Sequence, residues 1–102
     1  MYRLIDKRLY LTSSMDKIYK AMSDKNRRRI LELLKSHDMS VSELLKYFEI
    51  TQASLSHHLE ILRHANLVID ERRGQFVYYS LNVSVFEEFV KGLLDMVESK
   101  KE

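Results

Sequence analysis

Hydrophobic positions recur with a helical period along most of this chain. Between residues 13 and 36 they lie three or four positions apart, which predicts two helices. The first is expected to begin at Ser13, which forms a capping-box pattern with Asp16, and the second follows Asp24 as its N-cap. The pattern is broken at residues 37–38, so the second helix should end there.

Two shorter helices are predicted next, each by its own start signal. Ser40 and Glu43 form a capping box, and Thr51 stands at an N-cap position, with apolar residues around each start as in a hydrophobic staple. The first of these helices should end near Phe48. A helix, a short turn and a second helix therefore follow one another over residues 40–64, which is the spacing of a helix-turn-helix.

After Leu67 the apolar period changes from that of a helix to that of a strand. The run LVIDERRGQFVYYSL predicts two strands joined by a tight turn at Arg73-Gly74. Two strands placed directly after a helix-turn-helix are typical of a wing.

The last predicted helix covers residues 83–99 and is capped by either Asn82 or Ser84. The expected order is α-α-α-α-β-β-α, a mainly α fold with a β-hairpin wing. We predict a winged helix-turn-helix domain over residues 13–102, preceded by an arm or short helix over residues 1–12.

This last helix has more apolar side chains than one packing seam requires. Six of them form a stripe: Phe86, Phe89, Val90, Leu93, Leu94 and Val97. The helix could simply cover the core of its own chain. Two phenylalanines and the width of the stripe favour a further protein contact.

Composition narrows the class of protein. A chain of 102 residues with 45% hydrophobic and 31% charged residues indicates one globular domain. No apolar run approaches the roughly 20 residues that cross a bilayer, and the N-terminus lacks the apolar core of a signal peptide, so we expect a cytoplasmic protein. The absence of cysteine excludes disulfides and thiolate metal sites.

Charged residues are distributed unevenly along the chain, although the net charge is only +2. Basic residues crowd residues 20–35, and Arg72 and Arg73 form a second pair, whereas residues 83–102 have five acids against three lysines. The run from Arg27 to Arg29 opens a helix with core residues, so at least one of these arginines should form an intramolecular salt bridge.

Two adjacent histidines, His57 and His58, lie in the second helix of the helix-turn-helix. At about 100° per residue, three leucines share the side facing the body: Leu55, Leu59 and Leu62. His57 therefore points away from the domain, whereas His58 lies at the flank of the core, where a hydrogen bond within the protein is favoured over a metal ion. Glu60 and His64 supply two ligands where zinc needs three or four, so no metal site is predicted.

The outward side of this helix suits a DNA major groove. Gln52 can read adenine, Ala53 can contact the thymine methyl group, Ser56 and His57 can hydrogen-bond base edges, and Ser54 is placed for phosphate. Each residue alone could be an ordinary solvated side chain. Their combination within a helix-turn-helix favours base contact.

The wing offers a second contact. Arg72, Arg73 and Gln75 surround Gly74 at the predicted hairpin tip, where they can reach phosphates or a minor groove. A charged tip is also common in soluble hairpins.

Three segments in order resemble the ArsR-type (arsenic-repressor-like) winged-helix transcriptional regulators. They are KAMSDKNRRRILELL, MSVSELLKYFEITQASLSHHLEILRHANLV and DERRGQFVYYSL. The resemblance runs from about residue 16 to the end and implies a repressor that binds a palindromic operator as a homodimer. The first and last helices would form the interface, through Ile18, Tyr19 and the stripe of residues 86–97.

The same resemblance implies DNA contacts at particular positions. They fall on Ser54, Ser56 and His57 of the SLSHH motif, on Gln52, and on the wing from Arg72 to Gln75. The helix that begins at Ser40, Val41 and Ser42 would meet phosphate through its backbone amides.

Departures from the family pattern concern metal sensing. Many members have a Cys-Val-Cys-Asp-Leu motif where this chain has Ser40-Val41-Ser42-Glu43-Leu44, and hydroxyls are poor ligands for soft metals. Residues 83–102 contain no histidine, although other members use histidines there. A metal-independent repressor, similar to the family's cysteine-free autorepressors, therefore fits better, and no cofactor is expected.

Two alternatives stay open at this point. A metal-responsive repressor with a non-cysteine site is one. Another is a protein-interaction module whose apolar last helix binds a heterologous partner, such as a membrane-tethered antagonist that withdraws the repressor from DNA. An enzyme is not expected, because the chain has no cysteine nucleophile, no glycine-rich phosphate loop and no Ser-His-acid set suited to a cleft.

Overall fold

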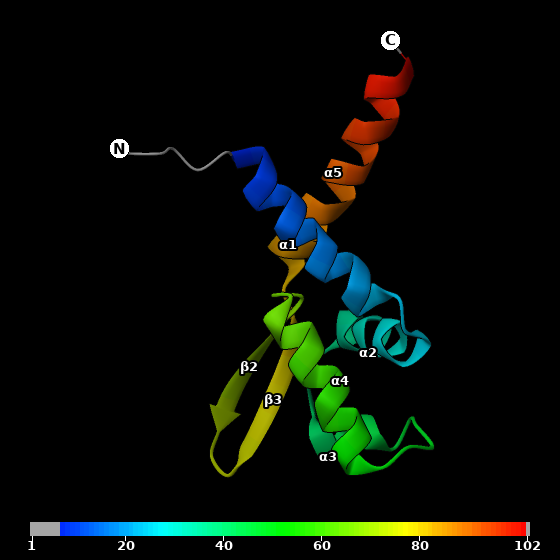
Figure 1. The fold of residues 1–102 in the computed structure, drawn as a ribbon. Helices are drawn as coiled ribbons and strands as arrows, with labels where there is room; N and C mark the ends of the chain where they lie inside the picture. The colour runs from blue at the N-terminus through cyan, green and yellow to red at the C-terminus, as the bar shows by residue number, and fades with distance from the viewer. Residues whose placement is uncertain (1–6, 102) are drawn as a thin grey trace, which may run out of the picture.

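The computed structural model describes residues 7–101 and has the predicted winged helix-turn-helix fold. Its elements are α1 (Lys7–Met22), α2 (Lys25–Ser36), β1 (Met39–Ser40), α3 (Val41–Leu45), α4 (Gln52–His64), β2 (Val68–Arg73), β3 (Phe76–Leu81) and α5 (Val83–Lys101). Figure 1 shows α1 and α5 crossing at one end of the molecule. At the other end lie α3, the start of α4 and the tip of the β2–β3 hairpin.

Local hydrogen bonds fix the starts of the helices where the sequence indicates them. The Asp24 carboxylate accepts bonds from the backbone amides of the second and third residues of α2. Thr51 Oγ1 accepts from the Ser54 amide at 3.0 Å. The side chain of Asn82, rather than that of Ser84, accepts from the amide three residues later, which settles the cap of α5. Side-chain acceptors at these positions satisfy amides that have no partner inside the helix.

The hairpin of the wing pairs β2 with β3 as far as Arg73 opposite Phe76. Its turn therefore consists of Gly74 and Gln75, one residue later than predicted. Gly74 has a φ of 65°, in the left-handed region that glycine adopts without strain, so this glycine makes the two-residue turn possible.

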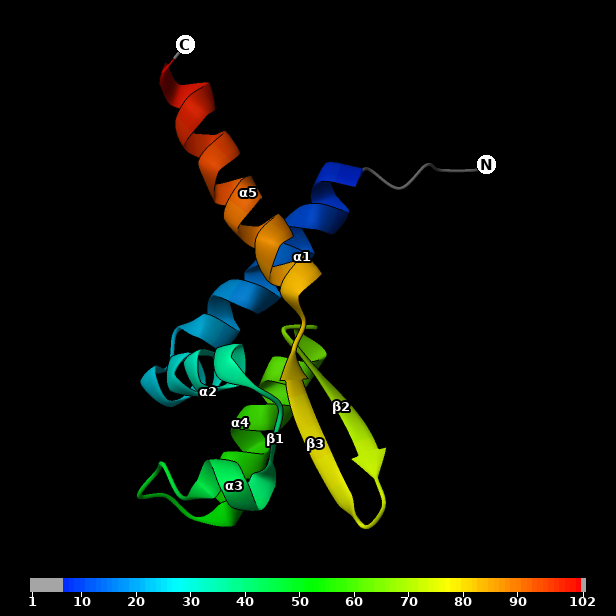
Figure 2. The ribbon, with the colours of Figure 1, turned by 180° about the vertical axis from the view of Figure 1, so that it is seen from behind.

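β1 was not predicted and adds a third strand to the sheet. The strand order is β1-β3-β2, with Met39 opposite Tyr79 and Ser40 opposite Tyr78. Figure 2 shows β1 running beside β3, just before α3 begins. A strand of two residues is too short to show alternation in the sequence, so only its partner reveals it. It ties the helix-turn-helix to the wing.

The core lies where α2, α3 and α4 meet the start of the wing. The largest side chains that are fully buried are Ile30, Leu44, Leu55, Leu59, Leu62 and Leu67. Three of them are the leucines of α4 that the sequence places toward the body. Their burial confirms the predicted orientation of α4.

The helix start predicted at Ser13 is wrong, because α1 begins at Lys7. Residues 7–12 contain neither proline nor glycine, so nothing in them stops a helix that tertiary packing stabilises. The predicted boundary between residues 12 and 13 falls inside this helix. Residues 1–6 of the predicted arm lie outside the described residues.

Candidate nucleic-acid interface

The first two turns of α4 present the side chains that are predicted to contact base edges. Gln52, Ala53, Ser56 and His57 are exposed, and Ser54 is half-buried. Because the opposite side of α4 is sealed by leucines, this face is the side that a partner can approach. Its short side chains would let the helix backbone come close to the floor of a major groove.

His58 is oriented differently from its neighbour. Its side chain is 12% exposed, and Nδ1 lies 3.1 Å from a terminal nitrogen of Arg27 and 4.0 Å from the Asp24 carboxylate. Burial lowers the pKa of His58; Asp24 opposes this shift, and the charges of Arg27 and His57 add to it. The predicted hydrogen bond of a flank histidine is confirmed.

Glu60 is held by an arginine of its own helix. Its carboxylate accepts from Nε of Arg63 at 3.0 Å and also from NH2 of that residue, and the bond to Arg63 lowers the pKa of Glu60. His64 Nδ1 lies 3.6 Å from the same carboxylate. Among the described residues, no three side chains of the metal-ligating types are grouped to hold an ion.

The start of α3 is closed by a reciprocal capping box. Ser40 Oγ accepts from the Glu43 amide at 3.3 Å, and the Glu43 carboxylate accepts from the Ser40 amide at 2.9 Å. The bond from the Ser40 amide to the carboxylate is the main cause that lowers the pKa of Glu43. Since the Ser40 amide is occupied, the predicted phosphate contacts of this segment narrow to the amides of Val41 and Ser42.

The two arginines of the wing have different surroundings. Arg73 donates from Nε to Glu71 and from NH2 to Asp38, each at 2.7 Å, and its guanidinium lies 4.9 Å from the centre of the Tyr78 ring. The bonds to Asp38 and Glu71 raise the pKa of Arg73. Arg72 points to the other face of β2 and is exposed, with no ion pair recorded for it within the described part of the chain.

Asp38 and Glu71 were missed by sequence reasoning, although one signal was available. Glu71 and Arg73 are two residues apart in a strand, so they share a face of the sheet. Nothing local points to Asp38, which is far along the chain from Arg73. Gly74 and Gln75, at the tip of the wing, are exposed as predicted. Of the predicted wing contacts, Arg72 and Gln75 are therefore exposed, whereas Arg73 is ion-paired within the chain.

The arginines at the start of α2 form hydrogen bonds and an ion pair within the chain. Arg28 donates to the carbonyl oxygen of Met22 at 2.7 Å, and Arg29 lies 3.9 Å from the Glu32 carboxylate. The predicted intramolecular salt bridge is therefore confirmed at Arg29. Arg28 and Arg29 are nevertheless exposed, so part of the charge of this basic run remains at the surface.

The predicted interface residues of the terminal helices fall into three groups. Ile18 and Phe89 are buried in the chain's own core, at 6% and 7% exposure, whereas Phe86 and Leu93 are half-buried. The others are exposed apolar side chains: Tyr19, Val90, Leu94 and Val97. The sequence stripe was wide because one edge of it packs inward and the other faces outward.

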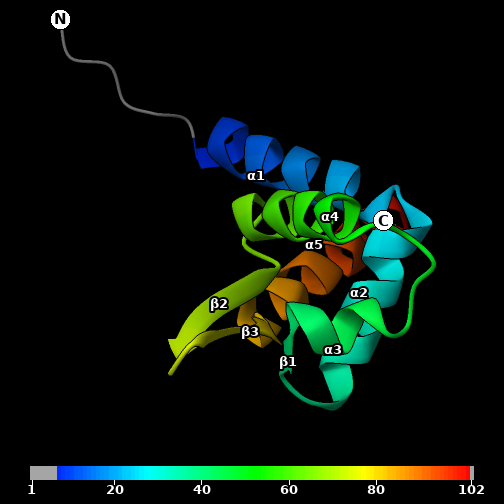
Figure 3. The ribbon, with the colours of Figure 1, turned by 90° about the horizontal axis from the view of Figure 1, so that it is seen from below.

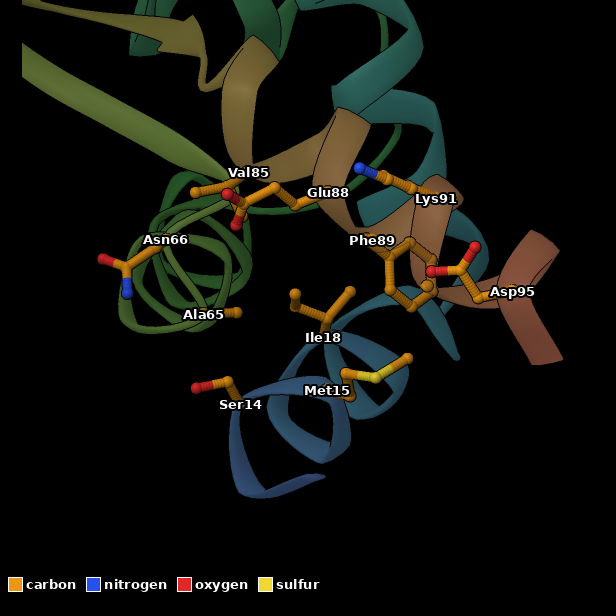
Figure 4. A pocket seen from close by; sticks show the side chains of 11 residues that line it. Ser14, Met15, Ile18, Ala65, Asn66, Val85, Glu88, Phe89, Lys91 and Asp95 are labelled. Atoms are coloured by element: carbon orange, nitrogen blue, oxygen red, sulfur yellow. The ribbon is translucent and has the colours of Figure 1, made fainter. Parts of the chain in front are cut away.

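A cavity of about 470 Å³ lies between α1, α5 and the end of α4 (Figure 4). Met15, Ile18 and Phe89 line it, with Glu88 and Asp95 from α5. Gly92 also lines it, and a Cβ at this position would lie 3.4 Å from the end of the Met15 side chain. The terminal helices thus pack more loosely than the centre. No helix within the described residues is both long and apolar enough to span a membrane.

Comparison with known proteins gives one consistent result. Residues 24–70 match the family described as bacterial regulatory protein, arsR family. The chain is 43% identical to the transcriptional repressor SdpR of Bacillus subtilis (strain 168) over 83 residues, which are 81% of this chain and 92% of that protein. It is also 43% identical over 77 residues to an arsenical resistance operon repressor of the same strain, covering 74% of this chain and 70% of the relative.

Solved structures agree on the fold. A homodimeric winged helix-turn-helix DNA-binding domain from Mycobacterium bovis is similar over 99% of this chain and 93% of its own, with a TM-score of 0.76 and 24% identity. The segment matched by the family includes α2, α3 and α4, with the exposed side chains at the start of α4. The chain belongs to the arsR family of bacterial regulatory proteins and is a winged-helix, DNA-binding regulator of transcription.

Proposed function

We propose that this protein is a cytoplasmic repressor that binds a palindromic operator as a homodimer, without a metal ion, and that it controls its own gene. α4 would read base edges through Gln52, Ala53, Ser56 and His57. The wing would contact the backbone through Arg72 and Gln75. The relatives named as repressors support the sign of the regulation.

The observation that carries this proposal is the division of the molecule into two ends. The exposed face of α4 and the wing tip lie at one end, and the crossing of α1 and α5 lies at the other (Figure 1). On α5, Val90, Leu94 and Val97 are 41%, 57% and 54% exposed and recur at helical spacing. A second copy that covers this stripe would leave both copies of α4 free for DNA.

Metal independence is supported by the chemistry of two candidate places for an ion in this chain. The motif of α3 has Ser40 and Ser42 in place of cysteines, and its Ser40 hydroxyl caps the helix. The Glu60 carboxylate is bonded to Arg63. Hydroxyls and an ion-paired carboxylate are poor ligands for soft metals.

The test is fluorescence anisotropy on a duplex from the upstream region of the protein's own gene, with a scrambled duplex of equal length as control. Preferential binding in chelator, unchanged by added zinc, is expected. Affinity should fall with salt at a slope of about −0.9 per phosphate neutralised. Equal binding to both duplexes would contradict autoregulation, and zinc-dependent release would contradict metal independence.

Solution mass tests the homodimer separately. Light scattering should give twice the chain mass of 12.2 kDa. A monomer at micromolar concentration would instead favour the second use of the α5 stripe, in which a heterologous protein antagonist, such as a membrane-tethered one, occupies it. The exposed apolar stripe of α5 is the observation that favours this second function, binding of a heterologous protein.

A further inference from the structure

One arginine connects α4 to the junction between α1 and α2. Nε of Arg27 donates to the carbonyl oxygen of Ala21 at 2.6 Å, and NH2 donates to that of Lys20 at 3.1 Å. NH1 of the same guanidinium lies 3.1 Å from Nδ1 of His58. All three nitrogens of the Arg27 guanidinium therefore have an acceptor within the protein.

These acceptors belong to two elements that are distant in sequence. Lys20 and Ala21 lie at the end of α1, next to Tyr19 of the proposed interface, whereas His58 lies in α4, next to His57. Figure 3 shows α1 and α4 lying alongside each other. The backbone of Arg27 is itself fixed, because its amide donates to the Asp24 carboxylate at 3.2 Å.

We propose that Arg27 is a positioning residue that holds α4 against the end of α1 through His58, and so fixes the direction in which His57 and its neighbours face DNA. The inference rests on the proposed function of α4 in reading base edges. In this arrangement α1, which carries part of the proposed dimer contact, also supports α4, the helix proposed to read DNA (the recognition helix). Interface and recognition helix are thereby connected within one chain.

The chemistry of the contact specifies the state of the histidine. NH1 of Arg27 can only donate, so Nδ1 of His58 must accept, which requires a neutral ring with its proton on Nε2. A protonated ring would place two donors against each other. The charged and titratable groups that face His58 are Asp24 from the loop before α2, Arg27 from α2, and His57 from α4 itself.

The pH dependence follows from this state. The pKa of His58 lies below its ordinary value, mainly because of burial. The neutral ring, and with it the bond to Arg27, therefore persists below the ordinary histidine pKa of about 6.5 and is lost as the pH falls through the lower pKa of the folded protein. Operator preference should weaken in the same window.

The first test compares Arg27→Lys with Arg29→Lys. Lysine keeps the charge but replaces the planar fork by a single point, which cannot serve three acceptors in this geometry. Arg29 is a matched control on the same helix, since its contact is with Glu32. Arg27→Lys should reduce the preference for operator over scrambled duplex about tenfold, and Arg29→Lys should leave it unchanged. Unchanged preference in Arg27→Lys would overturn the proposal.

The second test separates positioning from packing. His58→Asn keeps an acceptor near the position of Nδ1, whereas His58→Leu keeps apolar bulk and removes the acceptor. The asparagine variant should retain operator preference and lose its dependence on pH below about 6.5. The leucine variant should resemble Arg27→Lys, and the double variant should be no worse than either single one. Better function with leucine than with asparagine would contradict the proposal.

A measurement without DNA keeps this inference independent of the proposed function. Nitrogen-15 NMR of the free wild-type protein should show the Nε2-protonated tautomer of His58. Arg27→Lys should shift the amide signals of residues 52–64, and Arg29→Lys should not. If the wild type showed no operator preference, the proposed function would fail, while these spectra would still decide whether Arg27 positions α4.

Discussion

The centre of the molecule and its terminal helices differ in how completely their apolar side chains are buried within one chain. In the centre, Leu55, Leu59 and Leu62 of α4 are fully buried by the rest of the same chain. On α5, by contrast, Val90, Leu94 and Val97 remain about half exposed. Both helices are amphipathic, so amphipathicity alone does not tell which apolar face is internal. The apolar side chains of the centre are buried within one chain, whereas the terminal helices have an exposed apolar surface that suits a second chain.

The polar sides of the two regions differ in the same way. The outward face of α4 has small and hydrogen-bonding side chains, whereas α5 intersperses its apolar stripe with Glu87, Lys91 and Glu98. A surface that reads DNA needs short donors and acceptors, and a surface that binds protein needs apolar area with a charged margin. Each region has the side chains suited to one of these partners.

Truncating the core gives the largest expected effect. Leu59→Ala should lower the free energy of unfolding by about 2–5 kcal/mol, because it removes packed methyl groups and leaves a cavity. The loss, measured by urea denaturation, should be the same at low and high protein concentration. Leu94→Ala is the matched control, and its smaller loss should grow with protein concentration, since it acts through a second chain. Equal, concentration-independent losses would remove the distinction between the two regions.

A charge on the α5 stripe should separate the chains. Leu94→Lys should convert the dimer to a monomer in light scattering and weaken binding to a full palindrome by about a hundredfold, because the two half-sites are no longer joined. Thermal unfolding should still be cooperative. Glu88→Lys lies on the same helix but about a third of a turn around its axis from Leu94. It adds more positive charge and should leave the dimer intact. A dimer that survives Leu94→Lys would place the interface elsewhere.

Substitutions at the end proposed to bind DNA should separate base-specific contacts from electrostatic attraction to phosphates. His57→Ala should cost about 1–3 kcal/mol on the operator and much less on scrambled DNA, since a base contact is lost. Arg72→Ala should weaken both duplexes alike and reduce the salt slope by about 0.9. Arg73→Ala should change the slope less, because Asp38 and Glu71 already neutralise this side chain. The comparison fails if Arg73→Ala has the larger effect on the slope.

Loss of a helix cap gives the smallest expected effect. Ser40→Ala should lower stability by about 1 kcal/mol, because the Glu43 amide loses its acceptor. Glu43 has a lowered pKa, so the stabilisation it provides is present above the ordinary value of 4.5 and is lost as the pH falls through the folded value. Stability of the wild type should therefore fall at acid pH, and Ser40→Ala should show a shallower fall. Denaturant titrations at neutral and acid pH would measure both.

Much of the fold could be predicted because its signals are local. The caps at Asp24, Ser40 and Thr51 lie within a few residues of the amides they bind, and the period of apolar positions marks the change from helix to strand. The orientation of α4, and with it the exposure of His57, follows from the same period. The sequence by itself therefore determined the winged helix-turn-helix and the face of α4 proposed to read DNA.

The tertiary structure decided what depends on contacts between distant segments. The strand β1 exists only as a partner of β3. Arg73 is committed to Asp38, and Arg27 to His58, by pairings across 35 and 31 positions of the chain. Likewise, only packing separated Phe89, which is internal, from Leu94, which is not. Local periodicity places a residue on a face, but the partner across the fold decides whether that face is covered.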